Sequence, residues 1–239
     1  MQFFIDVDEV RVYLRTVMPL AEPKTAKEFN NRGLRHYRQE RYDDAARDFA
    51  TALRFDPKLT VAAAYRGMAF FEKKDYATAL ADLNEALQGD CKEDWVYKGR
   101  GRVYLATGKY NEAIADFTEA LRRRPDAASV YNYRGVSHAR LKRHAEAIAD
   151  YTRALEREPL TAAHYNRGVS LTRLGRRQEA IADFTAALQA DPNNVSYYDW
   201  RAENFLKVRL ARLVIPVGGL VGRVLKMQKG SRPKKSRDQ

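Results

Sequence analysis

Residues 94–127, DWVYKGRGRVYLATGKYNEAIADFTEALRRRPDA, decide the fold of this chain. Within this stretch, apolar residues recur with a period near 3.6 in two runs, which is typical of two amphipathic helices. Tyr97 and Gly101 lie on one face of the first run, and Ala113 and Phe117 lie on one face of the second. Because Gly and Ala lack bulk, the two helices can approach closely there, so the stretch predicts an antiparallel helical hairpin.

The same pattern occurs five times in phase. An Arg-Gly pair recurs, and its glycines are Gly33, Gly67, Gly101, Gly135 and Gly168, with steps of 34, 34, 34 and 33 residues. Each glycine is followed 12 residues later by Ala, then after four more by a large apolar residue, and after three more by Ala again. A proline that stops the second helix closes four units, and Cys91 takes its place in the second unit. One hairpin cannot bury its apolar face alone, so the repeats predict a stack.

This spacing resembles the tetratricopeptide repeat, in the bacterial-type variant that carries Asn-Arg-Gly, over about residues 26–194. The resemblance implies an all-α fold, a right-handed α-solenoid of stacked antiparallel helix pairs. We expect an N-terminal extension at 1–25 that can form a short helix, a C-terminal capping helix at 195–213, and an apolar loop segment with a basic, disordered tail at 214–239. The five units are expected at 26–59, 60–93, 94–127, 128–160 and 161–194.

Two charged positions repeat without exception. With each repeat glycine counted as position 8, position 7 is Arg and position 23 is Asp in all five units. The arginines are Arg32, Arg66, Arg100, Arg134 and Arg167, and the aspartates are Asp48, Asp82, Asp116, Asp150 and Asp183. A row of arginines could bind phosphate or nucleic acid. A ladder of Arg–Asp pairs between neighbouring helices is favoured, because the two residues recur together and their charges cancel.

The sequence offers no constellation for catalysis. It lacks a phosphate-binding G-x-x-x-x-G-K-[ST] loop, a G-x-S-x-G elbow and an H-E-x-x-H helix. The four histidines occupy slots that the repeat gives to aromatic residues, and none has metal-ligand spacing with the single cysteine: His36, His138, His144 and His164. We therefore predict no enzymatic activity, no catalytic residues, no cofactor and no metal.

The resemblance also predicts a partner-binding surface. In the family, the first helices of successive repeats line a concave groove, which positions 2, 5, 6, 9, 12 and 13 of each repeat face. The partner-binding residues carried over to this chain are Lys27, Asn30, Asn31, Arg38, Tyr65, Trp95, Lys98, Arg102, Asn132, Tyr133, Arg140, Tyr165, Asn166 and Arg173. The groove is thus expected to be basic with aromatic platforms, although several of these aromatics could instead pack between repeats. Trp, Tyr and Arg are the residue types that most often anchor interfaces.

These observations predict a protein-binding scaffold or adaptor whose ligand is an extended or helical peptide segment with acidic and aromatic residues. The chain carries a net charge of +12, and residues 226–239 hold a basic cluster. Nucleic-acid or anionic-membrane association through this tail and the groove is therefore the alternative. The apolar segment before the tail could instead fold back over the last repeat. A single cysteine, an acidic start and the lack of a long apolar run favour a cytoplasmic protein.

Overall fold

The computed structural model describes residues 22–210 and divides the chain into two compact units, one ending at Val103 and the other beginning at Tyr104. The boundary falls near the end of a helix of the third repeat. The predicted N-terminal extension lies largely outside the described residues. The apolar segment and the basic tail at 214–239 lie wholly outside them.

The described residues form helices joined by short turns and contain no strand. The first helices of the repeats are α2 (Ala26–Arg38), α4 (Thr60–Glu72), α6 (Asp94–Ala106), α8 (Ala128–Arg140) and α10 (Thr161–Arg173). The second helices are α3 (Tyr42–Phe55), α5 (Tyr76–Gln88), α7 (Tyr110–Arg123), α9 (His144–Leu155) and α11 (Arg177–Ala190). One more helix covers residues 195–210. The all-α class is therefore confirmed.

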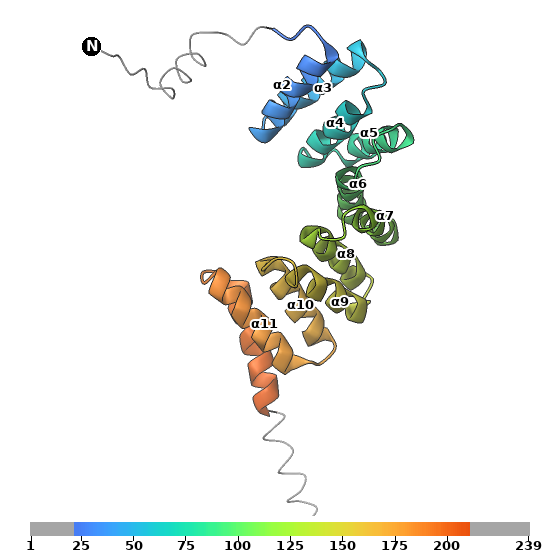
Figure 1. Ribbon diagram of the computed structural model, residues 1–239. Coiled ribbons are helices and arrows are strands. Elements are labelled where there is room, and N and C mark those ends of the chain that lie inside the picture. The colour runs from blue at the N-terminus through green and yellow to red at the C-terminus, as the bar shows by residue number, and fades with distance from the viewer. Residues whose placement is uncertain (1–21, 211–239) are drawn as a thin grey trace, which may run out of the picture. The chain divides into compact units, whose positions relative to one another are not determined.

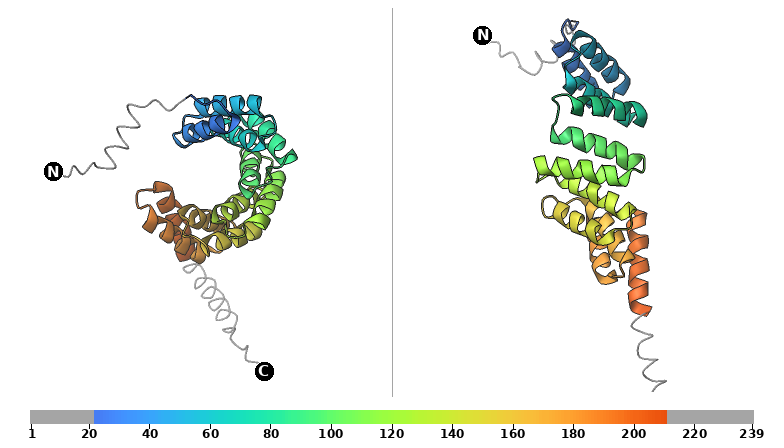
Figure 2. Two further views of the ribbon diagram at one scale, coloured as in Figure 1. Left: turned by 45° about the horizontal axis from the view of Figure 1, so that its top comes forward. Right: turned by 90° about the vertical axis from the view of Figure 1, so that its right-hand side faces the viewer.

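Helices that follow one another along the chain pack together within each unit (Figure 1). In the first unit α2 pairs with α3 and α4 pairs with α5, while α3 also contacts α4. In the second unit α8 pairs with α9 and α10 with α11, and α7–α8 and α9–α10 contacts join the hairpins. Both views in Figure 2 show this stacking of neighbouring helices. Each unit is thus a stack of antiparallel helix pairs, the architecture of an α-solenoid.

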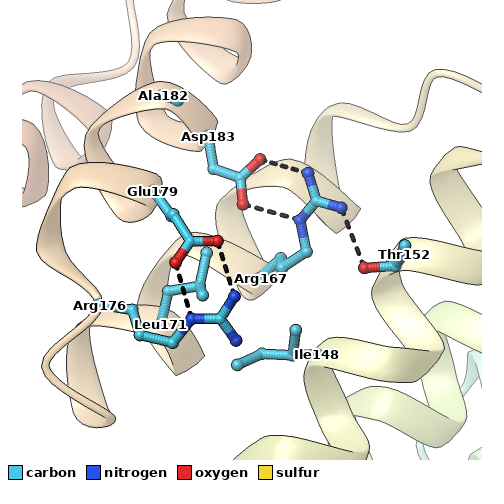
Figure 3. A pocket seen from close by; sticks show the side chains of 8 residues that line it. All are labelled: Ile148, Thr152, Arg167, Leu171, Arg176, Glu179, Ala182 and Asp183. Carbon is cyan, nitrogen blue, oxygen red and sulfur yellow. Dashed lines mark hydrogen bonds and ion pairs between the residues drawn. The ribbon is translucent and has the colours of Figure 1, made fainter.

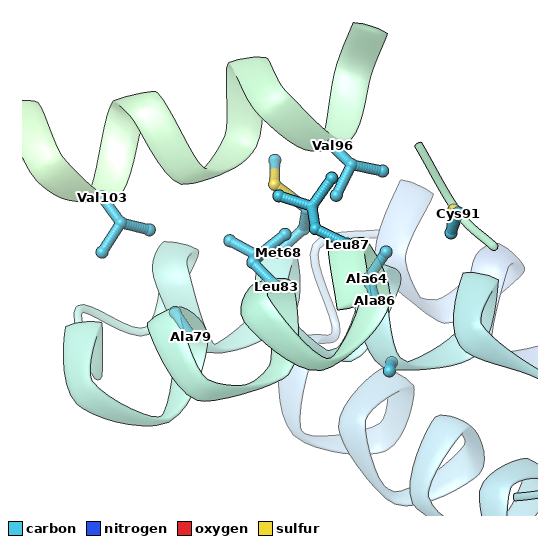
Figure 4. Close-up of a cluster of buried hydrophobic side chains, with 10 residues drawn as sticks. Ala64, Met68, Ala79, Leu83, Ala86, Leu87, Cys91, Val96 and Val103 are labelled. Carbon is cyan, nitrogen blue, oxygen red and sulfur yellow. The ribbon is translucent and has the colours of Figure 1, made fainter. Parts of the chain in front are cut away.

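The repeated small and large residues form the core. Ala45, Phe49 and Ala52 of α3 are all fully buried. The residues at the same positions of the other four repeats are equally buried. The repeat glycine lies against the large residue: a Cβ on Gly135 would lie 2.7 Å from Cε1 of Tyr151. Figure 4 shows the corresponding cluster of the first unit, where Leu83 takes the place of the aromatic ring. The close approach predicted from Gly and Ala is present.

The turn inside each hairpin uses a left-handed backbone conformation. The residue seven positions after each repeat glycine has a positive φ, at Gly108 and Gly175 but also at Glu40, Lys74 and Lys142. A left-handed residue just past a helix end lets the last carbonyls find N–H partners, and Gly is favoured there because other residues are strained. Three of the five hairpins therefore form despite a local backbone cost.

The helix at 195–210 continues the pattern of a first helix without a second helix among the described residues. Its Trp200 ring stacks on Phe184 of α11, with centroids 6.0 Å apart, and it joins the cluster of Leu171, Ala180 and Phe184. Lys207 and Arg209 are exposed on this helix. Large apolar side chains are exposed on the same helix, among them Phe205 at 54%.

Candidate partner-binding surface

The repeated arginine and aspartate form two-point ion pairs inside the hairpins. In the first, second, fourth and fifth repeats the guanidinium donates from Nε and Nη2 to both carboxylate oxygens, at distances of 2.7–2.8 Å. The aspartates of these pairs are nearly buried, at 3–5% exposure. Two parallel hydrogen bonds between opposite charges are the strongest geometry available to Arg. These pairs, here called the Arg–Asp ladder, hold the scaffold together as predicted.

In three repeats the remaining guanidinium nitrogen of the arginine, Nη1, donates to the second helix of the preceding repeat. Nη1 of Arg134 donates to Thr118 Oγ1 at 3.1 Å, and Nη1 of Arg167 donates to Thr152 Oγ1 at 3.0 Å. Nη1 of Arg100 likewise donates to an acceptor on the preceding second helix, Asn84 Oδ1, at 2.8 Å. Each of these arginines therefore joins two neighbouring repeats. The acceptor lies 17 residues after a repeat glycine in all three cases, so this missed contact had a signal in the repeat pattern.

Figure 3 shows one ladder pair at a surface hollow between α9, α10 and α11. The hollow has a volume of about 290 Å³. Arg167 pairs with Asp183 on one side of it, and Arg176 donates two hydrogen bonds to Glu179 on the other. Since these charged groups satisfy one another, the hollow offers no free charge to a ligand.

Two of the aromatic candidates stack on the core of the preceding repeat. Tyr65 lies between Phe49 and Trp95, with ring centroids 5.8 and 4.5 Å away. Tyr133 stacks on Phe117 at 5.8 Å with the same interplanar angle of 19° as Tyr65 and Phe49. These rings do pack between repeats, but each stays half-buried and keeps part of its surface in contact with solvent.

The polar candidates of the first unit lie in two environments. Lys27, Asn31 and Arg38 on α2 are accessible to solvent, whereas Asn30 is buried. The buried Oδ1 of Asn30 has no hydrogen-bond partner among residues 22–210. α2 therefore combines three accessible polar side chains with one enclosed amide.

On α6, Lys98 and Arg102 are half-buried. Arg102 donates to Glu72 Oε1 at 3.3 Å, and its guanidinium lies 4.3 Å from the centroid of the Phe71 ring. Glu72 is one of the few acids at the groove positions of the repeat, and the structure shows that it partly neutralises Arg102. The first unit is therefore less basic here than expected.

In the second unit the candidate amides meet across two first helices. Asn166 Nδ2 on α10 donates to Asn132 Oδ1 on α8 at 3.1 Å. Arg140 and Arg173 at the ends of these helices are accessible, and Arg173 lies over the Trp200 ring at 5.7 Å from its centroid. The pairing of the two amides could not be read from sequence because the shortened fourth repeat puts them at different repeat positions.

Tyr165 completes the aromatic candidates. Its ring is 5.1 Å from Tyr197 of the C-terminal helix and 6.1 Å from Phe184, with tilted planes. It is half-buried, so α10 presents it beside Asn166 at the junction with residues 195–210. Tyr197 was not among the predicted residues, because its role depends on where the last helix packs.

Three histidines lie beside ladder aspartates. His164 Nδ1 is 2.9 Å from Asp183 Oδ1, and the Nε2 atoms of His36 and His138 are 3.6 and 3.9 Å from Asp48 and Asp150. The sequence pattern predicted that these histidines replace aromatic residues of the repeat. It did not predict their contacts with the ladder aspartates. Burial lowers the pKa of His138, partly opposed by the Asp150 charge, and burial lowers the pKa of His144 with help from Arg173.

Within residues 22–210, no group of His, Cys, Asp and Glu side chains is arranged to hold a metal ion. In the same range, no helix is long and apolar enough to cross a membrane. Cys91 is a buried free thiol whose pKa is raised by that burial.

Known proteins share this architecture. The family model described as "Tetratricopeptide repeat" matches residues 30–94, 98–160 and 145–195. Among solved structures, "YrrB: a TPR protein with an unusual peptide-binding site" is similar, with a TM-score of 0.64, 18% identity, and coverage of 73% of this chain and 90% of that one. MamA is similar with a TM-score of 0.62, 20% identity, and coverage of 69% and 97%.

A further similar structure is TTC0263, a thermophilic TPR protein of Thermus thermophilus, with a TM-score of 0.58, 21% identity, and coverage of 76% of this chain and 100% of that one. No curated protein sequence matches the chain. At these identities the solved structures show the fold alone, while the family model covers most of the chain. The repeats, the hairpin packing and the family match together show that this chain belongs to the tetratricopeptide repeat family.

Proposed function

We propose that this chain is a non-catalytic scaffold that binds an extended or helical peptide segment, rich in acidic and aromatic residues, on the faces of its first helices. Tetratricopeptide repeat proteins generally act as protein-interaction scaffolds. The similar YrrB structure is described as having an unusual peptide-binding site, and this supports the proposal of peptide binding.

The amide pair Asn132–Asn166 carries the proposal. Because Asn166 donates to Asn132 Oδ1, the Nδ2 group of Asn132 and the Oδ1 atom of Asn166 remain without a hydrogen-bond partner among the described residues. One donor and one acceptor match the C=O and N–H of a peptide unit. A peptide main chain that crosses α8 and α10 would therefore find both hydrogen bonds at a half-buried position.

Two accessible arginines extend the same faces. Arg140 follows Asn132 by eight residues on α8, and Arg173 follows Asn166 by seven on α10. Residues seven or eight apart lie on one side of a helix, two turns along. Arg guanidinium groups recognise carboxylates in two-point geometry, so a peptide held by the amides would favour acidic side chains toward this end.

The first unit supports the aromatic part of the preference. The stacked Tyr65 and Trp95 form a half-buried platform on α4 and α6, near half-buried Lys98 of the same helix as Trp95. Such rigid rings contribute large contact area at a small cost in conformational entropy. We expect an aromatic ligand side chain to pack on this platform.

The absence of catalysis is part of the proposal. The aspartates most enclosed in the structure are held by ladder arginines, which favours a structural role over general acid–base chemistry. A buried free thiol at Cys91 suits a reducing compartment, and we propose a cytoplasmic location on that basis.

A peptide library displayed on phage and selected on the full chain tests this function. We expect selected peptides to be enriched in Asp, Glu and aromatic residues. Their affinity should fall about tenfold or more for the variant Asn132→Ala with Asn166→Ala, because it removes two neutral hydrogen bonds of about 1 kcal/mol each. A similar fall is expected for Arg140→Glu, because a hydrogen bond to a charged group contributes about 1.5–3 kcal/mol.

The matched control is Arg54→Glu, a charge reversal at an exposed position of the second helix α3. It should leave peptide binding unchanged, and all variants should keep the parent melting temperature. Peptides that bind the amide and Arg140 variants as tightly as the parent would show that the ligand does not use these faces.

A further inference from the structure

A hollow lies between α11 and the C-terminal helix at residues 195–210. It is lined by Ile181, Thr185, Tyr198, Arg201, Ala202 and Phe205, and its volume is about 450 Å³. Four of these six residues have apolar or aromatic side chains. We call this hollow the end slot.

The residues that line the end slot occupy the same repeat positions as residues of α9 and α10 that lie beside α11, the second helix of the fifth repeat. Ile181 and Thr185 correspond to Ile148 and Thr152, each pair 33 residues apart. Arg201 and Ala202 correspond to Arg167 and Gly168 of the fifth repeat, each pair 34 residues apart, and there α11 packs against α10. The end slot is therefore the place where the second helix of a sixth repeat would lie.

The exposure of the C-terminal helix agrees with a missing neighbour. Val195, Tyr198 and Phe205 are 69%, 44% and 54% exposed, and they lie along one stripe of the helix with Ala202. In the fifth repeat, Leu171 at the position of Phe205 is only 3% exposed because α11 covers it. An end cap normally turns a polar face outward, so this apolar stripe indicates a surface that something else covers.

Arg201 shows what that covering element must carry. It occupies the position of the ladder arginines, and four of those donate two hydrogen bonds to an aspartate on the second helix. Among the described residues, no carboxylate lies within ion-pair distance of Arg201, whose guanidinium lies 5.4 Å from the centroid of the Tyr198 ring. An acidic residue in the occupant would complete a sixth ladder pair.

Residues 211–237, which follow the C-terminal helix, lack this chemistry. After Glu203 the next acidic residue is Asp238, so residues 211–225 could cover the apolar stripe but could not pair with Arg201. The C-terminal helix also continues to at least residue 210, whereas α10 ends at Arg173, the position equivalent to about residue 207. The charge and the helix length both favour an occupant from another molecule.

Ala202 adds a steric preference. Every other repeat has Gly at this position, and a Cβ added there would lie 2.7–2.9 Å from the aromatic ring of Phe49, Tyr151 or Phe184. Where the large residue is Leu83, the nearest side-chain atom would be 3.0 Å away. A helix that packs in the end slot as the second helices pack in the repeats would place its large residue against Ala202. A leucine would therefore fit better than an aromatic ring at the position after its acidic residue.

We propose that the end slot binds an amphipathic helix of a partner protein, with an acidic residue that pairs with Arg201, a following leucine, and alanines one turn before and after. This site uses other residues than the peptide-binding faces proposed above, so either proposal can fail without the other. The chain's own α5 has this pattern in residues 75–88, DYATALADLNEALQ, with Asp82 before Leu83.

The probe is therefore a fluorescent peptide of residues 75–88, stapled between positions 77 and 81, which are exposed on α5. The staple preserves the helix, which an isolated peptide of this length would not keep in water. Fluorescence anisotropy with the full chain should show saturable binding. Affinity should fall about tenfold or more for the chain variant Arg201→Ala or for the peptide change Asp82→Ala.

A charge exchange makes the test specific. The chain variant Arg201→Glu should bind the peptide with Asp82→Arg better than the unchanged peptide, while Arg209→Ala, exposed on the same helix, should bind like the parent. Phe205→Asp should abolish binding without changing the far-ultraviolet circular dichroism spectrum. Failure of the full chain to bind the stapled peptide, or binding that ignores both Arg201 and Asp82, would overturn the proposal.

A photo-crosslinking amino acid in place of Tyr198 identifies any competing occupant. Crosslinks from the full chain to its own residues 211–239, or to a second copy, would also overturn the proposal, because the slot would then be filled by this chain. A crosslink to the stapled peptide, with neither of those products, is the expected result.

Discussion

Arg134 and Asp150 lie sixteen residues apart in sequence and face each other across α8 and α9, with Nε–Oδ2 and Nη2–Oδ1 distances of 2.8 and 2.7 Å. The carboxylate side chain is 5% exposed, so its charge depends on the guanidinium for compensation. The same geometry recurs in three other hairpins, which makes the ladder a property of the repeat and not of one site.

Replacing Arg134 with Ala should destabilise the protein strongly. Removal of one partner of an enclosed ion pair leaves the other charge uncompensated, which costs about 3 kcal/mol. Urea denaturation followed by circular dichroism measures this loss. The control Arg176→Ala breaks a pair whose side chains are 48% and 57% exposed, and it should cost less than about 1 kcal/mol. Equal losses for the two variants would contradict a structural role for the ladder.

Replacing Gly135 with Ala should destabilise the protein although Ala is the better helix former. Ala gains roughly 0.5–1 kcal/mol of helix preference over Gly. Its Cβ would lie 2.7 Å from Tyr151 Cε1, and overpacking of a core typically costs about 1–3 kcal/mol. Ser129→Ala, at an exposed position of α8, is the control and should not lower the urea midpoint. A Gly135→Ala protein as stable as the parent would show that the hairpin can widen there without cost.

Replacing Lys142 with Gly should stabilise the protein. Lys142 has a φ of 61°, and a left-handed conformation costs a residue with a Cβ roughly 1 kcal/mol. The measured free energy of unfolding should therefore rise by about 0.5–1 kcal/mol. Gly108→Ala should have the opposite sign, since Gly108 has a φ of 79° and nothing lies within 4 Å of its added Cβ. A loss of stability in Lys142→Gly would mean that the lysine side chain contributes more than its backbone strain costs.

Removing the Tyr65 ring should expose Trp95. The chain has two tryptophans, so the measurement uses Trp200→Phe to leave Trp95 as the only reporter. Tyr65→Ala in that background should shift the emission maximum of Trp95 to longer wavelength and increase its quenching by acrylamide, because the 4.5 Å stack is lost. Tyr65→Phe keeps a ring and should leave both quantities unchanged. An unshifted spectrum in Tyr65→Ala would place Trp95 away from the Tyr65 ring in solution.

Protonation of His138 at acidic pH should lower the free energy of unfolding. Burial lowers the pKa of this imidazole in the folded state, with Arg134 and Arg143 acting in the same direction and Asp150 and Glu146 against it. In the unfolded chain the pKa returns to about 6.5, so below that pH the unfolded state binds more protons. The free energy of unfolding should therefore fall as the pH falls through about 6.5 toward the lower folded value.

The variant His138→Phe should lose part of this pH dependence, since it removes the titrating group and keeps an aromatic ring. Urea midpoints measured on either side of the unfolded-state pKa, at about pH 7.5 and about pH 5.5, provide the comparison between the parent and the variant. If the two proteins lose the same stability between these pH values, His138 does not contribute to the acid effect.

The hairpins could be predicted because their cause is local and repeated. The spacing from Gly101 to Ala113 and Phe117 places small residues on facing sides of two helices, and five copies in phase leave one way to stack them. The ladder followed from the same argument, because Arg134 and Asp150 recur at fixed positions with cancelling charges. The contacts of the predicted partner-binding residues could not be predicted in the same way. The repeat position of a residue indicates the helix face on which its side chain lies, but not which side chains it contacts.

The sequence alone determined the helical hairpins, their number and the pairing of Arg with Asp, because each depends on a short period within one repeat. Only the tertiary structure decided that Tyr65 stacks between two rings, that Asn132 accepts from Asn166, and that Arg201 has no carboxylate partner among residues 22–210. The physical reason is that these contacts join side chains of different repeats. They depend on the residue that the neighbouring helix presents and, at the end of the stack, on whether a neighbouring helix is there.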